Sequence, residues 1–243
     1  MTEKSTLKEI EERFDQDVTR FSNLDTGQQT TLDALFNMEL ITDGIAAVYP
    51  ELKRVLDIGC GAGNYPVKLA HKVSDFDCTL VDLSQPMLDK AKERVQEMTS
   101  GEVECVKGDF RTVDLTANSY DVIIATAVLH HLRDDQDWEG AFQKLYGLLK
   151  EGGSIWIFDL VIHDHEAIQN LVYKNHYGAY LTSLKDESYR DHVFAYIEKE
   201  DTPRSVNYQL DLLKKVGFKS VDVLHKKLNF ASFVAFKSGN KAS

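Results

Sequence analysis

Five short apolar runs, separated by stretches of helical periodicity, occupy the middle of this chain. Each run is too short and too uniformly apolar to be a strand with one face in water, so strands buried on both faces are favoured. Strands of this kind that alternate with helices are typical of a parallel sheet covered by helices on both sides. The pattern therefore predicts a doubly wound, Rossmann-like α/β fold. The runs lie at residues 54–58, 77–81, 102–106, 121–125 and 154–158.

Both ends of the chain and one later segment depart from this alternation. Two further apolar runs, 220–224 and 230–236, predict a mostly parallel sheet of seven strands with an antiparallel final strand. Apolar residues at helical spacing on both sides of a polar break at 22–29 predict two N-terminal helices. Tyrosine, histidine and charged residues then replace the alternation before the last two strands, which predicts a helical insertion. We expect an N-terminal helical lid at 1–50, a core at 51–162 and 202–238, and an insertion or cap at 163–201.

Several helix boundaries are marked by the residues that usually begin or end helices. Ser84 is a candidate N-cap, and Pro86 follows in the first turn. A helix at 138–149 is expected to stop at the glycine pair 152–153. Thr202 and Pro203 are expected to open the helix that Gly217 closes.

The charge and the cysteines restrict the compartment and the partners. Acidic residues outnumber basic ones by 39 to 28, which gives a net charge of -11. This sign disfavours a nucleic-acid partner, because such proteins neutralise phosphates. The three cysteines form an odd set without metal-type spacing, so we expect a reducing compartment and no metal ion. No run approaches the roughly 20 apolar residues of a membrane span, and we expect a cytoplasmic protein with no membrane partner.

The strongest local signal is the apolar run at 54–58, which leads directly into a glycine-rich turn. Gly59, Gly61 and Gly63 allow a tight turn and a close approach of the backbone to a ligand. Asp82 ends the next apolar run nineteen positions after Gly63, where a carboxylate can accept hydrogen bonds from ribose hydroxyls. A tight turn without a ligand is the competing interpretation.

The spacing of these glycines also discriminates between ligands. G-x-G-x-G is one residue shorter than the fingerprint that places a dinucleotide pyrophosphate on a helix N-terminus. Asp57, two residues before the first glycine, would repel a pyrophosphate and attract an ammonium or a sulfonium. An adenosine ligand that carries a positive charge is therefore predicted.

Five motifs in order resemble the class I S-adenosylmethionine-dependent methyltransferases, and the resemblance covers about residues 53 to 236. They are VLDIGCGAG at 55–63, VDLSQPML at 81–88, GDF at 108–110, YDVIIATAVLHHL at 120–132 and LLKEGG at 148–153. The resemblance implies S-adenosyl-L-methionine as the cofactor. It also implies cofactor contacts by eleven residues: Asp57 near the amino acid part, Gly59, Gly61 and Gly63 beneath the cofactor, Asp82 on the ribose, Leu83 and Met87 against the adenine, Asp109 and Phe110 at its edge, and Thr126 and Ala127 at the methionine part. For Leu83 and Met87 the alternative is a core role, and for Asp109 a turn role.

The resemblance says less about catalysis and substrate. His130 or His131 is a candidate general base, with a structural cap over the following loop as the alternative. The N-terminal helices, with Phe21, Gln28 and Gln29, are expected to fold over the cofactor mouth. The candidate substrate residues are Arg20, Tyr177, Tyr180 and Arg190. The tyrosines equally suit a core or a contact between two copies in a homodimer, and Arg190 suits a surface salt bridge.

The prediction for function is methyl transfer from S-adenosylmethionine to a small-molecule acceptor. The tail at 217–236 is also similar to carboxy-S-adenosylmethionine synthase, an enzyme of tRNA wobble-uridine modification. That resemblance implies a carboxylate-binding arginine in the preceding helix, where this chain has Leu212. A non-catalytic S-adenosylmethionine-binding protein is the third alternative.

Overall fold

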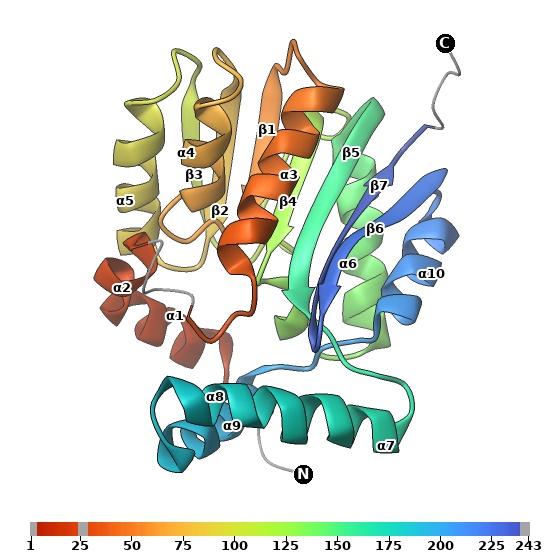
Figure 1. The fold of residues 1–243 in the computed structure, drawn as a ribbon. Helices are drawn as coiled ribbons and strands as arrows, with labels where there is room; N and C mark the ends of the chain where they lie inside the picture. The colour runs from red at the N-terminus through yellow and green to blue at the C-terminus, as the bar shows by residue number, and fades with distance from the viewer. Residues whose placement is uncertain (1–3, 24–28, 239–243) are drawn as a thin grey trace.

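The computed structural model describes residues 4–23 and 29–238 and contains one seven-stranded sheet (Figure 1). The strand order is β3-β2-β1-β4-β5-β7-β6. Strands β1 to β5 are parallel, whereas β7 runs antiparallel to both β5 and β6. The predicted fold class is therefore confirmed. The strands are β1 (Arg54–Ile58), β2 (Asp77–Asp82), β3 (Val103–Lys107), β4 (Tyr120–Thr126), β5 (Leu149–Leu160), β6 (Ser220–Lys227) and β7 (Phe230–Phe236).

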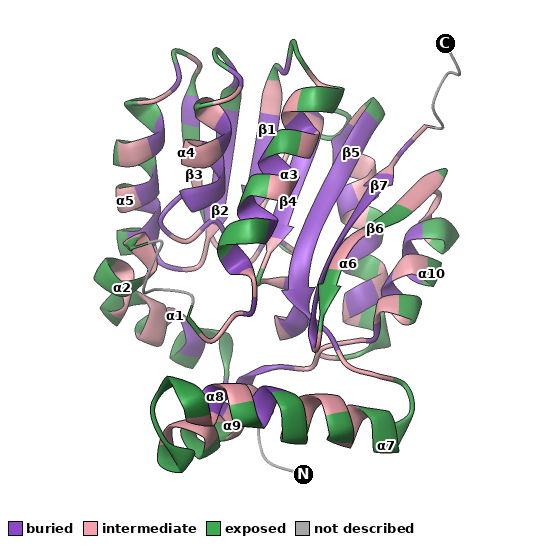
Figure 2. Cartoon of the chain, viewed as in Figure 1, coloured by how far each residue is buried: buried purple, intermediate pink, exposed green. Residues whose placement is uncertain are grey.

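Helices cover both faces of the sheet, because neighbouring residues of a buried strand point to opposite sides. Val55 of β1 belongs to the apolar cluster beneath α3, α4 and α5, whereas Leu56 belongs to the cluster beneath α6 and α10. The central strands are consequently buried along most of their length (Figure 2). These helices are α3 (Ala34–Val48), α4 (Asn64–Ala70), α5 (Gln85–Gln96), α6 (Asp135–Leu148) and α10 (Val206–Val216).

The remaining helices gather at the carboxyl ends of the parallel strands (Figure 1). Two short helices come from the N-terminus, and a helical series fills the segment between β5 and α10. The two groups contact each other, since Ser5 N donates to Lys199 O at 3.2 Å. Helices therefore occupy the expected lid and cap, although the division into these parts stays a prediction. The helices are α1 (Leu7–Gln16), α2 (Val18–Ser22), the 3₁₀ turn η1 (Leu129–His131), α7 (Glu166–Gln169), the π-helix η2 (Asn170–Tyr177), α8 (Gly178–Leu184) and α9 (Glu187–Glu200).

Two of the predicted helix boundaries are confirmed and two are wrong. The helix expected to stop at the glycine pair 152–153 ends at Leu148 instead, because β5 begins at Leu149 and contains both glycines. Ser84 caps α5, because its hydroxyl accepts from Met87 N at 3.3 Å. Gly217 ends α10 with a φ of +121°. The expectation for Pro203 was wrong: α10 begins at Val206, since the side chain of Ser205 caps it by accepting from Tyr208 N.

Among the described residues, no helix combines the length and the apolar character needed to cross a bilayer.

Candidate functional site

The turn after β1 is built from three glycines with positive φ. The φ angles are +63° at Gly59, +49° at Gly61 and +74° at Gly63. A Cβ on Gly59 would lie 2.6 Å from Cγ2 of Val128, whereas a Cβ on Gly61 would meet no atom within 4 Å. The turn is therefore tightly packed at its first glycine and faces open space at its second.

Asp82 links this turn to the end of β2. Its Oδ2 accepts from the Gly61 N–H at 2.8 Å, and its Oδ1 accepts from the Ser84 N–H at 2.9 Å. Burial raises the pKa of Asp82, although these backbone N–H groups act in the opposite direction. The carboxylate is thus held in one orientation beside the glycine turn, at the carboxyl edge of the sheet where ligands of open α/β folds bind.

A cavity of about 150 Å³ opens beside this carboxylate, between the ends of β1, β2 and β4 and the N-terminal helices. Nine of the eleven predicted cofactor residues line it, although their role as cofactor contacts stays a prediction. The nine are Gly59, Gly61, Asp82, Leu83, Met87, Asp109, Phe110, Thr126 and Ala127. Met87 is also a buried member of the α5 stripe, so the core and pocket interpretations both hold for it.

The other two predicted residues, Asp57 and Gly63, lie behind the cavity wall. Asp57 is 2% exposed, and its Oδ1 has no hydrogen-bond partner. Burial, and then the negative charge of Asp82, raise its pKa well above the ordinary value. Gly63 serves packing: a Cβ there would lie 3.1 Å from Cβ of Ala91 on α5.

The N-terminal helices cover the cavity. Ser84 Oγ donates to Asp15 of α1 at 2.5 Å, and Asn64 Nδ2 donates to the backbone oxygen of Phe21 at 2.9 Å. Phe14 and Phe21 line the cavity with ring centroids 5.5 Å apart. Sequence reasoning placed Phe21 here but missed the α1 residues Leu7, Ile10 and Phe14. Their helical spacing was the available signal, but it does not say what the apolar face covers.

A second, larger cavity of about 510 Å³ lies between these helices and the insertion. It shares Phe14, Phe21, Ala127 and His131 with the first cavity. Arg20 and Tyr177, two of the four predicted substrate residues, line it together with Gln29; Gln28 lies outside the described residues.

The other two predicted substrate residues lie outside the walls of both cavities. The hydroxyl of Tyr180 donates to the backbone oxygen of Gln29 at 2.7 Å. Arg190 pairs with Asp191 at 2.8 Å and with Glu187 at 3.8 Å, as expected for the surface alternative.

Comparison with known proteins identifies the fold family. Residues 55–153 match the family model described as "Methyltransferase domain". Curated relatives include the carboxy-S-adenosyl-L-methionine synthase of Nautilia profundicola, 24% identical and covering 98% of this chain and 100% of its own length. The corresponding synthase of Campylobacter lari is 26% identical and covers 83% of this chain and 84% of its own. Together these matches support a class I S-adenosylmethionine-dependent methyltransferase. The cofactor of this family is S-adenosylmethionine.

Several solved structures share the fold of this chain at low sequence identity. Phosphoethanolamine N-methyltransferase 2 of Haemonchus contortus, in complex with S-adenosyl-L-methionine, has a TM-score of 0.58 at 18% identity and covers 93% of this chain and 60% of its own. The [4+2]-cyclase SpnF has a TM-score of 0.63 at 12% identity and covers 97% of both chains. Since one neighbour is a cyclase, the fold alone does not decide the chemistry.

The two histidines that the sequence offers as candidate general bases lie where the two cavities meet. His130 is buried, and its Nδ1 pairs with Asp159 Oδ1. Burial alone would lower the pKa of His130, but the carboxylates of Asp159 and Asp201 outweigh it and raise the pKa to about 9. Burial and the charge of His130 instead lower the pKa of His131, which lines both cavities. Asp159 and Asp201 were missed by sequence reasoning.

Proposed function

We propose that this methyltransferase transfers the methyl group of S-adenosylmethionine to a small molecule held in the second cavity. The observation that carries the proposal is the wall common to both cavities, which contains Ala127 and His131. Ala127 has a φ of +51°, and its N–H donates to Phe158 O at 2.8 Å. Ala127 thus contributes only a methyl group to the wall that the two cavities share.

The residues around the first cavity fit the cofactor. The unpartnered Oδ1 of Asp57 places an acidic group behind the glycine turn, which suits the ammonium of the methionine part. The open space beside Gly61 leaves room for the ligand, and Asp82 retains lone pairs for ribose hydroxyls.

The adenine end of the cavity is apolar with a polar edge. Leu83, Met87 and Phe110 line it, and Asp109 lies at its rim. Arg111 donates to both oxygens of Asp109: its backbone N–H and Nε–H reach Oδ1 at 2.9 and 3.0 Å, and its Nε–H and Nη2–H reach Oδ2 at 2.9 and 2.5 Å. Arg111 also contacts Asp137 at 2.7 Å. Since a carboxylate offers about four lone-pair sites and these three N–H groups use about three, Asp109 can accept one more hydrogen bond, from an adenine amino group.

Catalysis in this arrangement depends mainly on positioning. When bound, S-adenosylmethionine supplies an electrophilic methyl group on a positively charged sulfur. Phe14 and Phe21 line both cavities and contribute apolar rings to the wall that the cavities share. Holding an acceptor in line across this junction converts an encounter of two molecules into a reaction within one complex.

The second cavity suits a small molecule without a large negative charge. Its volume of about 510 Å³ is in the range of ordinary ligand pockets, and aromatic side chains contribute to its lining. Its two arginines are already paired: Arg13 with Glu200 at 2.6 Å and Arg20 with Asp17 at 3.2 Å. A net charge of -11 also disfavours a polyanionic acceptor.

The test is to incubate the protein with S-adenosylmethionine and a fractionated small-molecule extract. We expect S-adenosylhomocysteine to form together with one metabolite whose mass increases by one methylene group. Asp82→Ala should abolish both products, whereas Asp222→Asn, an exposed carboxylate change on β6, should not. Cofactor binding without turnover in any fraction would contradict the proposal and favour the non-catalytic alternative.

A carboxy-S-adenosylmethionine synthase is the second candidate, because curated relatives of that name align with 83% to 98% of this chain. The absence of the implied carboxylate-binding arginine at position 212 counts against this candidate. Leu212, at the position where that resemblance implies an arginine, is 6% exposed in the apolar cluster beneath α10. Mass spectrometry of the nucleoside retained on purification decides, because a carboxylated cofactor is heavier than S-adenosylmethionine.

A further inference from the structure

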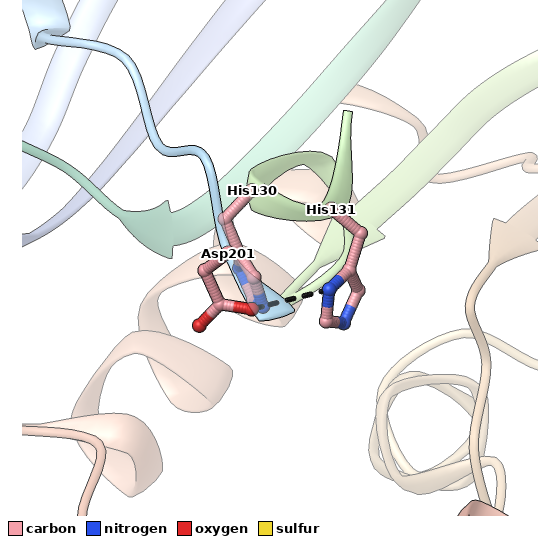
Figure 3. A group of neighbouring side chains, drawn as sticks. All are labelled: His130, His131 and Asp201. Carbon is pink, nitrogen blue, oxygen red and sulfur yellow. Dashed lines mark ion pairs between the residues drawn. The ribbon is translucent and has the colours of Figure 1, made fainter. Parts of the chain in front are cut away.

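Two histidines and an aspartate converge at one edge of the second cavity (Figure 3). His130 and His131 belong to η1, after β4, and Asp201 follows α9 seventy positions later in the chain. One ligand atom from each residue lies within 4.8 Å of the others. The fold therefore assembles two imidazoles and a carboxylate from distant segments.

Asp201 Oδ1, on a side chain that is 3% exposed, faces both histidines. It pairs with His131 Nδ1 at 3.2 Å and lies 3.7 Å from His130 Nε2. Beyond this pair, neither Asp201 Oδ1 nor His131 Nδ1 has a hydrogen-bond partner among the described residues. A divalent ion placed among the three atoms would bind all of them at once.

His130 is oriented as a metal-binding histidine usually is. Its Nδ1 pairs with Asp159, and Nε2 is left facing Asp201. Asp159 is itself fixed, because Oδ2 accepts from Leu129 N at 2.8 Å and Oδ1 from Leu160 N at 2.7 Å. Histidine ligands of metals commonly donate their second ring N–H to a carboxylate in this way.

The spacing of the three atoms suits a small tetrahedral ion. Ligand atoms at about 2.0–2.1 Å from such an ion lie about 3.3 Å from one another. The distances from Asp201 Oδ1 to the two histidine nitrogens, 3.2 and 3.7 Å, lie on either side of that value. The carboxylates of Asp201 and Asp159 also balance the two positive charges of a divalent cation.

We propose that His130, His131 and Asp201 bind a divalent transition-metal ion of the Zn²⁺ type, with a free coordination position toward the second cavity. All three residues line that cavity, and three protein ligands leave a fourth tetrahedral position for a small molecule. The sequence predicted no metal ion, since these ligands come from segments too far apart to form a spacing motif. We further expect an oxygen or sulfur atom of the methyl acceptor to occupy the free position, and this part rests on the proposed function. Binding of the ion itself does not depend on the proposed function.

The experiment uses the full chain, stripped with a chelator and titrated with Co²⁺ and Zn²⁺ without cofactor. We expect one equivalent of Co²⁺ to bind with the visible absorption of a tetrahedral site and to be displaced by Zn²⁺. Asp201→Asn keeps the size of the side chain but removes the anionic ligand, and should weaken binding at least tenfold, as should His131→Ala. Asp159→Asn should weaken binding by about 10–100-fold with the stoichiometry unchanged. His176→Ala, an exposed histidine of η2, is the matched control and should bind as the wild type does.

Circular dichroism confirms that each variant is folded, and the thermal midpoint should rise with Zn²⁺ in the wild type and the control. The proposal is overturned if the stripped wild type binds neither ion, because a proton on His130 would then bridge the carboxylates. It is also overturned if folded Asp201→Asn and His131→Ala bind as tightly as the wild type. S-adenosylhomocysteine binding, measured in parallel, distinguishes failure of this proposal from failure of the proposed function.

Discussion

Alanine substitutions at Gly61 and Gly63 should separate ligand binding from folding within one turn. At Gly63 a side chain costs about 1–2 kcal/mol because φ is +74°. It costs about 1–3 kcal/mol more because the new Cβ would lie 3.1 Å from both Cβ of Ala91 and Cγ2 of Val95. Gly63→Ala should therefore lower the free energy of unfolding by about 2–5 kcal/mol, a large part of the 5–15 kcal/mol typical of a domain.

Gly61→Ala should instead reduce ligand affinity more than it reduces the stability of the fold. The φ of +49° again costs about 1–2 kcal/mol, but the Cβ would meet no atom within 4 Å and would enter the open space beside the cavity. We expect a smaller loss of stability and a loss of S-adenosylhomocysteine affinity of about tenfold or more, which is about 1.4 kcal/mol. Gly63→Ala, where it remains folded, should keep most of its affinity.

Urea unfolding and titration calorimetry of the two variants test this contrast. Gly140→Ala is the matched control, because Gly140 lies within α6 with no atom within 4 Å of its Cβ position. It should raise stability by about 0.5–1 kcal/mol and leave binding unchanged. The reasoning is refuted if Gly63→Ala is as stable as the wild type, or if Gly61→Ala binds S-adenosylhomocysteine with undiminished affinity.

Three further predictions concern the carboxylates and the cap. Asp82→Asn should weaken S-adenosylhomocysteine binding by about 1.5–3 kcal/mol in calorimetry, since it removes charged hydrogen bonds; unchanged affinity would contradict the ribose assignment. Burial raises the pKa of Asp57 above its ordinary 3.8, so the folded protein holds this proton more tightly than the unfolded chain. The free energy of unfolding of the wild type should therefore fall relative to that of Asp57→Asn as the pH rises from 3.8 through the raised pKa. A difference in unfolding free energy that stays constant with pH would disprove this. Ser84→Ala should cost about 1 kcal/mol in urea unfolding, because it removes the cap on α5 and the hydrogen bond to Asp15. A loss below a few tenths of a kcal/mol would show that neither contact stabilises the fold.

The sheet and the glycine turn could be predicted because their physical requirements leave local traces. A strand buried on both faces is apolar along most of its length, and β1 and β7 were located to the residue. A turn with three positive φ angles requires glycine, so Gly59, Gly61 and Gly63 mark it. Nine of the predicted cofactor residues line one cavity, because they lie at or just after the ends of adjacent parallel strands.

The other parts of the site are formed by contacts between segments far apart in the sequence. The stripe that contains Ile10 and Phe14 shows that one face of α1 is buried, but not that it covers a cavity. Asp201 meets the histidines only because the insertion returns to the carboxyl edge of the sheet. The start of α10 was misjudged for a local reason: Pro203 suits a first helical turn, but the Ser205 side chain caps the helix two positions later.

The most direct test of the account is a crystal structure of the protein with S-adenosylhomocysteine. We predict that adenine lies among Leu83, Met87 and Phe110, that the ribose hydroxyls donate to Asp82, and that the sulfur faces Ala127. Density for the nucleoside outside this cavity, or an empty cavity at saturating ligand, would contradict the central claim.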